Sequence, residues 1–77
     1  MILPVQLKMA RAALDLGVRD VSKLSGISAN TISRYENGSD ARGSTLRKIQ
    51  SVLEEAGIEF LDENGGGPGV RLRRPDQ

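Results

Sequence analysis

The segment SGISANTISRYENG, residues 25–38, places side chains that can read DNA bases at helical spacing. Asparagine bonds bidentately to adenine, arginine bonds in the same way to guanine, and alanine contacts the thymine methyl group. A solvent-facing helix side would also carry such polar residues, but it would hold more long charged side chains. Positions i, i+3, i+4 and i+7 of one helix face are Asn30, Ser33, Arg34 and Asn37, with Ala29 at the N-terminal end. Base reading is therefore predicted for Ala29, Asn30, Ser33 and Arg34.

The helix that carries this face is expected to be short, about residues 29–36. Ser28 is a good N-cap, and Asn37-Gly38 ends the run. An isolated helix of fewer than about 12 residues is marginal in water, so neighbours must hold this one. A second short helix, about residues 19–25, precedes it and ends at Gly26. Two short helices joined through a glycine are typical of a helix-turn-helix. A small residue, Ser22, would lie where the two helices cross. The apolar residues beneath the crossing would be Val21, Ile27, Ile32 and Tyr35, and the second helix also presents Leu24.

Two longer helices are predicted on either side of this pair. Pro4 suits the first turn of a helix that runs to about Asp15. Its apolar residues at helical spacing are Val5, Met9, Ala12, Ala13 and Leu16. A last helix would be capped by Ser44 or Thr45 and would stop at Gly57. Its inward residues are Leu46, Ile49, Val52, Leu53 and Ala56.

After Gly57 the apolar period changes to two, which indicates strands. Ile58 and Phe60 alternate with Glu59, Val70 and Leu72 alternate with arginines, and the glycine-rich DENGGGPG lies between them. We therefore expect a mainly α protein: a four-helix helix-turn-helix domain at residues 1–57, followed by a β-hairpin and a short basic tail at residues 58–77. A lone hairpin is barely stable, so Ile58, Phe60, Val70 and Leu72 are the predicted dimer interface.

Composition narrows the classes of function. The 77 residues include no cysteine and no histidine, which removes disulfides, ordinary zinc sites and histidine acid–base catalysis. The glycine run lacks the Lys-Ser/Thr of a phosphate-binding loop. An enzyme, a metal site and a cofactor are therefore not expected. Lys8 and Arg11 interrupt the apolar N-terminal run, so no signal peptide or membrane span is expected either, and the predicted location is cytoplasmic.

The net charge of +1 hides an uneven distribution. Residues 1–50 hold eight basic and four acidic side chains, whereas residues 51–70 hold five acidic side chains and no basic one. The basic surface therefore belongs to the helical part of the chain. The basic tail, with Arg71, Arg73 and Arg74, is either a flanking phosphate contact or an ordinary solvated end.

Residues 8–56 resemble the phage-repressor and Cro type of helix-turn-helix protein, often called the xenobiotic-response-element (XRE) family. The segment LSGISANTISRYENG carries the resemblance. The family pairs a helix-one arginine with a glutamate that ends the recognition helix, and Arg11 and Glu36 occupy those positions. By the same resemblance the base readers are Ala29, Asn30 and Arg34, with Ser33 a lesser candidate. The implied phosphate contacts are Ser28, Asn37, Ser39, Arg42 and Thr45.

The chain departs from that family in two places. Gly17-Val18 stand where the family has a polar cap and a phosphate-binding glutamine, and Arg19 is the candidate replacement. Many small members also end with a fifth helix that forms the dimer, whereas this chain ends with GIEFLDENGGGPGVRLRR. The resemblance implies a homodimer on a palindromic operator, and the hairpin interface is inferred from the residues alone.

These observations favour a sequence-specific transcription regulator of bacterial or phage origin. Its expected partner is double-stranded DNA. It would act by covering a promoter, with its own promoter as one candidate, or by contacting RNA polymerase or another regulatory protein. The alternative is a protein-interaction module, such as an antitoxin or antiactivator, in which the helix-turn-helix is a scaffold. RNA binding ranks third, because Tyr35 and Phe60 are too few for an aromatic stacking platform.

Overall fold

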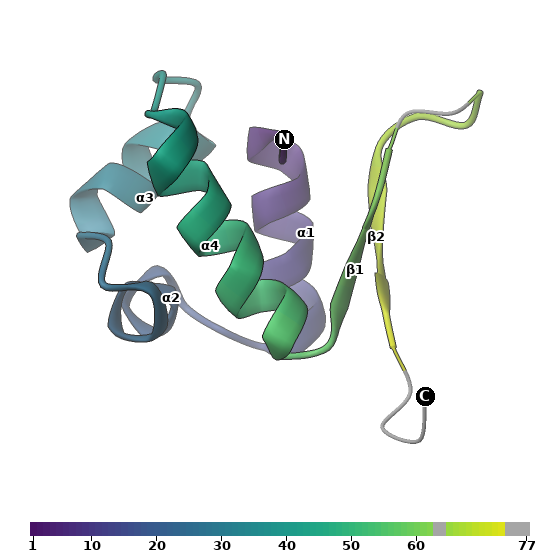
Figure 1. Ribbon diagram of the computed structural model, residues 1–77, viewed down its shortest axis with the longest axis horizontal. Helices are drawn as coiled ribbons and strands as arrows, with labels where there is room; N and C mark the ends of the chain where they lie inside the picture. The colour runs from purple at the N-terminus through teal and green to yellow at the C-terminus, as the bar shows by residue number, and fades with distance from the viewer. Residues whose placement is uncertain (63–64, 74–77) are drawn as a thin grey trace.

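A computed structural model describes residues 1–62 and 65–73 (Figure 1). Four helices are followed by a two-stranded antiparallel hairpin, which confirms the predicted mainly α class. Arg74, assigned to the basic tail, lies outside the described residues. The elements are α1 (Pro4–Leu14), α2 (Val18–Ser25), α3 (Ala29–Glu36), α4 (Gly43–Glu55), β1 (Ile58–Leu61) and β2 (Gly69–Leu72).

The start of α3 follows the expected capping chemistry, whereas the start of α4 does not. The Ser28 hydroxyl accepts a hydrogen bond from the Thr31 N–H at 3.2 Å. The cap predicted at Ser44 or Thr45 is wrong, because α4 begins earlier and its N-cap is Arg42, which makes no side-chain cap hydrogen bond. The Arg42 carbonyl oxygen instead accepts from the Leu46 N–H at 3.0 Å, so the backbone alone closes the first turn.

The hydrophobic core lies between the four helices and extends to the first residue of β1. Its fully buried large side chains are Ile2, Leu7, Val21, Ile32, Ile49, Leu53 and Ile58. The inward residues predicted for α3 and most of those predicted for α4 are in this core or packed against it. Leu24 and Ala56 are exceptions, since both side chains are exposed.

The apolar residues predicted at helical spacing for α1 mark its buried face only in part, since Leu16 packs against the core but others of the set do not. Val5 is 48% exposed, and Ala12 and Ala13 are exposed as well, whereas the buried residues of α1 are Gln6, Leu7 and Ala10. Apolar residues occur around most of α1, so periodicity alone could not choose between its sides. The buried side of α1 is the one that includes Gln6, because the Gln6 amide has hydrogen-bond partners there.

The hairpin packs against the helices of its own chain. Figure 1 shows it beside α1 and α4, on the side opposite α2 and α3. β1 lies against α4 and β2 against α1. The register pairs Ile58 with Leu72 and Phe60 with Val70, so these four side chains share one face of the hairpin. Ile58, at 1% exposed, completes the helical core.

Gln6 fixes the hairpin to α1. Its side chain is 4% exposed, and its Nε2 donates to the carbonyl oxygens of Leu61 and Gly69 at 2.9 and 3.0 Å. Its Oε1 accepts from the Leu3 N–H at 2.9 Å. Every polar atom of this buried amide is therefore satisfied, and both strands are tied to α1 at the loop end of the hairpin.

Replacing Gln6 with leucine should lower the free energy of unfolding by about 1–3 kcal/mol, because the partly buried N–H of Leu3 loses its acceptor and two carbonyls lose a donor. Denaturant unfolding followed by circular dichroism measures this change. Gln50→Leu is the matched control, since the Gln50 amide only reaches the exposed Glu54 carboxylate. Equal stability losses in the two variants would contradict the role given to Gln6.

Candidate nucleic-acid interface

The outward face of α3 carries the predicted base readers. Asn30, Arg34 and Asn37 are exposed, and Ala29 and Ser33 are half-buried. The opposite face holds Ile32 and Tyr35, both of which are buried in the core. The structure thus separates a polar, accessible side of α3 from an apolar, anchored side, as the spacing of the residues predicted.

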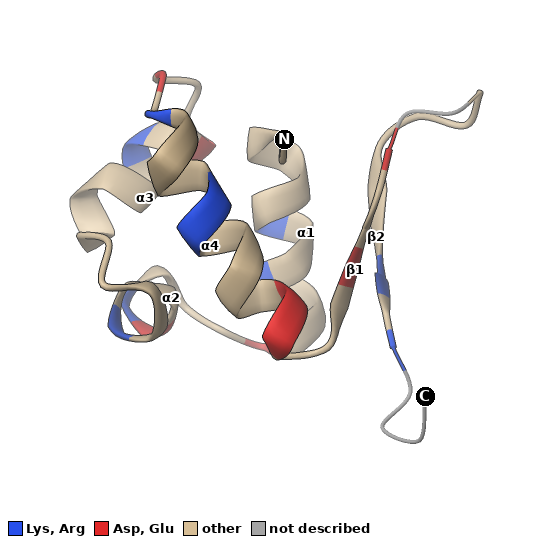
Figure 2. Cartoon of the chain, in the orientation of Figure 1, with Lys and Arg blue, Asp and Glu red and all other residues tan. Residues whose placement is uncertain are grey.

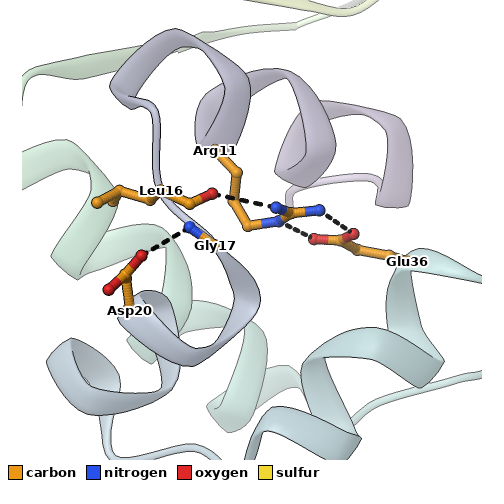
Figure 3. Close-up of polar contacts among 5 residues, drawn as sticks. All are labelled: Arg11, Leu16, Gly17, Asp20 and Glu36. Carbon is orange, nitrogen blue, oxygen red and sulfur yellow. Dashed lines mark hydrogen bonds and ion pairs between the residues drawn. The ribbon is translucent and has the colours of Figure 1, made fainter.

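Arg11 joins α1 to the end of α3 through an ion pair with Glu36 (Figure 3). The Arg11 Nε donates to Glu36 Oε2 at 2.6 Å and its Nη2 donates to Oε1 at 2.8 Å. The side chains are 22% and 6% exposed, respectively. The hydrogen bond to Glu36 raises the pKa of Arg11 above its ordinary value. A bidentate geometry of this kind fixes direction as well as distance.

The same guanidinium also fixes the connection into α2. Its Nη1 donates to the Leu16 carbonyl oxygen at 3.1 Å, as Figure 3 shows. One arginine therefore holds α1, the α1–α2 connection and α3 in place. Because α2 follows directly from that connection, both helices of the helix-turn-helix are oriented against α1.

The N-terminal segment holds the inner side of α3. The Tyr35 hydroxyl donates to the Ile2 carbonyl oxygen at 2.6 Å in the interior. Burial raises the pKa of Tyr35, and the Asp40 carboxylate adds to the rise. Together with the Arg11 pair, this bond holds the C-terminal half of α3 from two directions.

The start of α2 uses a partner that sequence reasoning missed. Gly17 provides no side-chain cap, but the Asp20 carboxylate accepts a hydrogen bond from the Gly17 N–H at 2.8 Å (Figure 3). An acidic residue three positions beyond the cap was the available signal, because it can reach back to the cap backbone and favours the positive end of the helix. Arg19 is exposed in this first turn.

The predicted phosphate contacts surround α3. Ser28, Asn37, Ser39 and Arg42 are exposed, and Thr45 is half-buried. They lie at the start of α3, in the α3–α4 connection and in the first turn of α4. Figure 2 shows basic segments on all four helices, with acidic segments on α2, at the end of α3, in the α3–α4 connection, at the C-terminal end of α4 and on β1. Basic positions on α2 and α4 therefore flank α3.

The predicted dimer residues are not equivalent. Ile58 belongs to the core of the single chain, and Phe60 and Val70 pack partly against that core. Leu72 is 52% exposed, at the far end of the same hairpin face. Among the described residues, no helix is long and apolar enough to cross a membrane.

Comparison with known proteins gives two matches. A family model described as helix-turn-helix matches residues 7–60. The chain is also 35% identical over 57 residues to a protein of Archaeoglobus fulgidus named "Putative HTH-type transcriptional regulatory protein". That match covers 74% of the present chain and 18% of the relative, so the chain spans about a fifth of the length of this relative.

Replacing Glu36 with alanine should lower the free energy of unfolding by about 2–3 kcal/mol, because the guanidinium of Arg11 would remain partly buried without its carboxylate. Thermal unfolding of the DNA-free protein measures the loss. Glu55→Ala removes an exposed carboxylate from α4 and should change stability by less than about 0.5 kcal/mol. Equal melting temperatures of the Glu36→Ala and Glu55→Ala proteins would show that the Arg11–Glu36 pair does not hold α3.

Proposed function

Because the chain belongs to the helix-turn-helix family of the phage-repressor and Cro type, we propose that it binds a specific double-stranded DNA sequence and regulates transcription from it. The outward face of α3 is the observation that carries this proposal. That face is polar and accessible, and the helix behind it is held by a bidentate ion pair and a buried tyrosine hydrogen bond. A rigid helix can present its side chains to base edges without further ordering.

In the proposed complex, α3 lies in the major groove. Arg34 would bond bidentately to guanine and Asn30 to adenine, while Ala29 at the N-terminal end would meet a thymine methyl. Ser33 is half-buried beside the exposed Asn30 and Arg34, so its short side chain would reach only a base edge that lies close to the helix. Small side chains at two of the four positions let the helix backbone approach the bases closely.

The surrounding polar residues would fix the protein on the DNA backbone. The proposed phosphate contacts are Ser28, Asn37, Ser39, Arg42, Thr45 and Arg19. They flank α3 on the start of α2, the start of α4 and the connections between helices. Contacts of this kind set the register on the duplex and carry no sequence information. Binding should therefore weaken as the salt concentration rises.

Arg34→Ala should remove about 1–3 kcal/mol of discrimination at one base pair while leaving the fold intact. Arg42→Ala is the matched control, since it also removes one exposed arginine but should weaken all sequences alike and flatten the salt dependence. Selection of bound sequences from a random library, followed by binding isotherms at two salt concentrations, measures both effects. Unchanged sequence preference in Arg34→Ala would refute the assignment of α3 as the reading helix.

We further propose that the protein acts as a two-fold dimer on a palindromic operator, and that this operator lies at its own promoter. Two reading helices must lie about 34 Å apart to enter successive major grooves on one side of the DNA. α3 and the hairpin lie at opposite sides of the chain in Figure 1, so a contact between hairpins keeps the two copies of α3 well separated. Leu72 is the exposed member of the hairpin's apolar face and would centre that contact.

Leu72→Glu should convert the dimer to a monomer and weaken binding to a palindromic site, because the charge would enter an apolar contact between subunits. Leu24→Glu is the control, since Leu24 is 55% exposed on α2, away from the hairpin. Sedimentation equilibrium without DNA reports the assembly state of each variant. A Leu72→Glu protein that remains dimeric would move the interface elsewhere, and a monomeric parent at operator-saturating concentration would remove the dimer from the proposal.

A further inference from the structure

The outer edge of β1 is free of hydrogen-bond partners in the described part of the chain. The Arg73 N–H donates to the Gly57 carbonyl oxygen at 2.7 Å, immediately before the Ile58–Leu72 pair. Bonded and non-bonded pairs alternate along an antiparallel ladder, so the N–H and C=O groups of Ile58 and Phe60 point away from β2. No other described residue bonds to these four groups. They form a template for one more strand.

A hollow of about 400 Å³ follows this edge. It is lined by Ile58, Glu59 and Phe60 of β1 together with Glu54 and Arg73. Successive side chains of a strand point to opposite faces, so a hollow that reaches three consecutive residues of β1 lies at its edge. The space is therefore placed where an added strand would run.

A second hollow of about 450 Å³ continues this space along the exposed side of α4. The two hollows share Glu54 and are together called the groove, which is lined by Arg47 and Arg73 as well as by Glu54 and Glu59. Four residues of α4 line the second hollow at helical spacing, and Met1 closes its far side. They are Arg47, Gln50, Ser51 and Glu54.

The opposite edge of β1 shows which kind of strand it accepts. The sequence of β2 alternates apolar and basic residues, Val70-Arg71-Leu72, and Arg73 follows. Arg71 Nη1 lies 3.8 Å from Glu59 Oε1, and Arg73 Nη2 donates to the Glu54 carbonyl oxygen at 2.6 Å. Figure 2 shows the resulting contrast, with acidic segments on β1 and basic segments on β2. A strand of the same character suits the free edge.

Charge opposes pairing of this edge with the same edge of a second copy. Antiparallel pairing of Ile58 with Phe60 of another copy would set the two Glu59 side chains directly opposite each other, which destabilises a sheet. A shift by two residues pairs Phe60 with Phe60 and avoids this repulsion, but it sets each Glu59 opposite Leu61, without the opposite charge that a basic strand supplies. The free edge therefore favours a basic strand from elsewhere over its own duplicate.

We propose that the β1 edge, beside α4, binds an extended segment of another protein in which apolar and basic residues alternate. The segment adds a third strand to the hairpin, and its main chain bonds to Ile58 and Phe60. Its apolar side chains continue the face of Phe60, and its basic side chains meet Glu54 and Glu59. This interaction requires neither DNA nor the Leu72 contact, so it is tested apart from both.

Titration with the acetylated, amidated peptide VRLRVRLR tests the site. Amide hydrogen exchange read by NMR should show new protection at the N–H groups of Ile58 and Phe60, and none at those of Val70 and Leu72. The scrambled peptide RRVLLVRR, which has the same composition without alternation, should give no such pattern. Protection of Val70 and Leu72 instead, equal effects of the two peptides, or no binding up to millimolar concentration would each overturn the proposal.

Glu59→Lys should weaken peptide binding about fivefold, because an opposed charge pair becomes a repulsive one. Glu55→Lys makes the same charge change on α4 outside the groove and should leave binding within about twofold. Circular dichroism confirms that both variants are folded. Equal weakening of peptide binding in both variants would mean that only the net charge of the protein matters, which would contradict a site at Glu59. Protection of Ile58 and Phe60 that grows with protein concentration alone would make a second copy the occupant and overturn the assignment to another protein.

Discussion

The guanidinium of Arg11 is the constraint on which the rest of the helical domain depends. It bonds at once to Glu36 at the end of α3 and to the Leu16 carbonyl oxygen before α2. α3 has only eight residues, too few for a stable helix in isolation. Its direction is therefore set by contacts outside itself, and a lysine, with one point of charge in place of a planar fork, could not hold both groups in this geometry.

A second set of hydrogen bonds extends this constraint to the hairpin. The Tyr35 hydroxyl of α3 donates to the Ile2 carbonyl oxygen, and the N–H of the following residue, Leu3, donates to the Gln6 side chain. The Gln6 side chain in turn donates to a carbonyl oxygen of each strand. The N-terminal segment thus links the proposed reading helix to the hairpin without passing through the exposed loops. A displacement of the hairpin would therefore strain these hydrogen bonds and, through them, the position of α3, because packed interior contacts deform less readily than surface contacts.

The sequence was informative where local chemistry decides the structure. The bounds of α3 were predicted because Ser28 caps it and Asn37-Gly38 ends it, and the hairpin was predicted because its apolar residues alternate. The polar face of α3 followed from the same spacing. The buried face of α1 was predicted only in part because apolar residues surround that helix, and the role of Gln6 was missed because its partners are backbone carbonyls more than fifty positions away. Neither fact leaves a local signal.

The uneven charge of the chain gains a structural meaning from the fold. Basic segments on α2, α3 and the start of α4 lie on the side of the molecule that carries α3, and the acidic segments of β1 and of the end of α4 lie toward the hairpin (Figure 2). A DNA backbone attracts the first and repels the second. With α3 in a major groove, β1 would therefore face away from the duplex, and a strand bound at its edge would add little to the contact with DNA. The same chain could then bind DNA on one side and a protein on the other, because none of the proposed DNA contacts lines the groove.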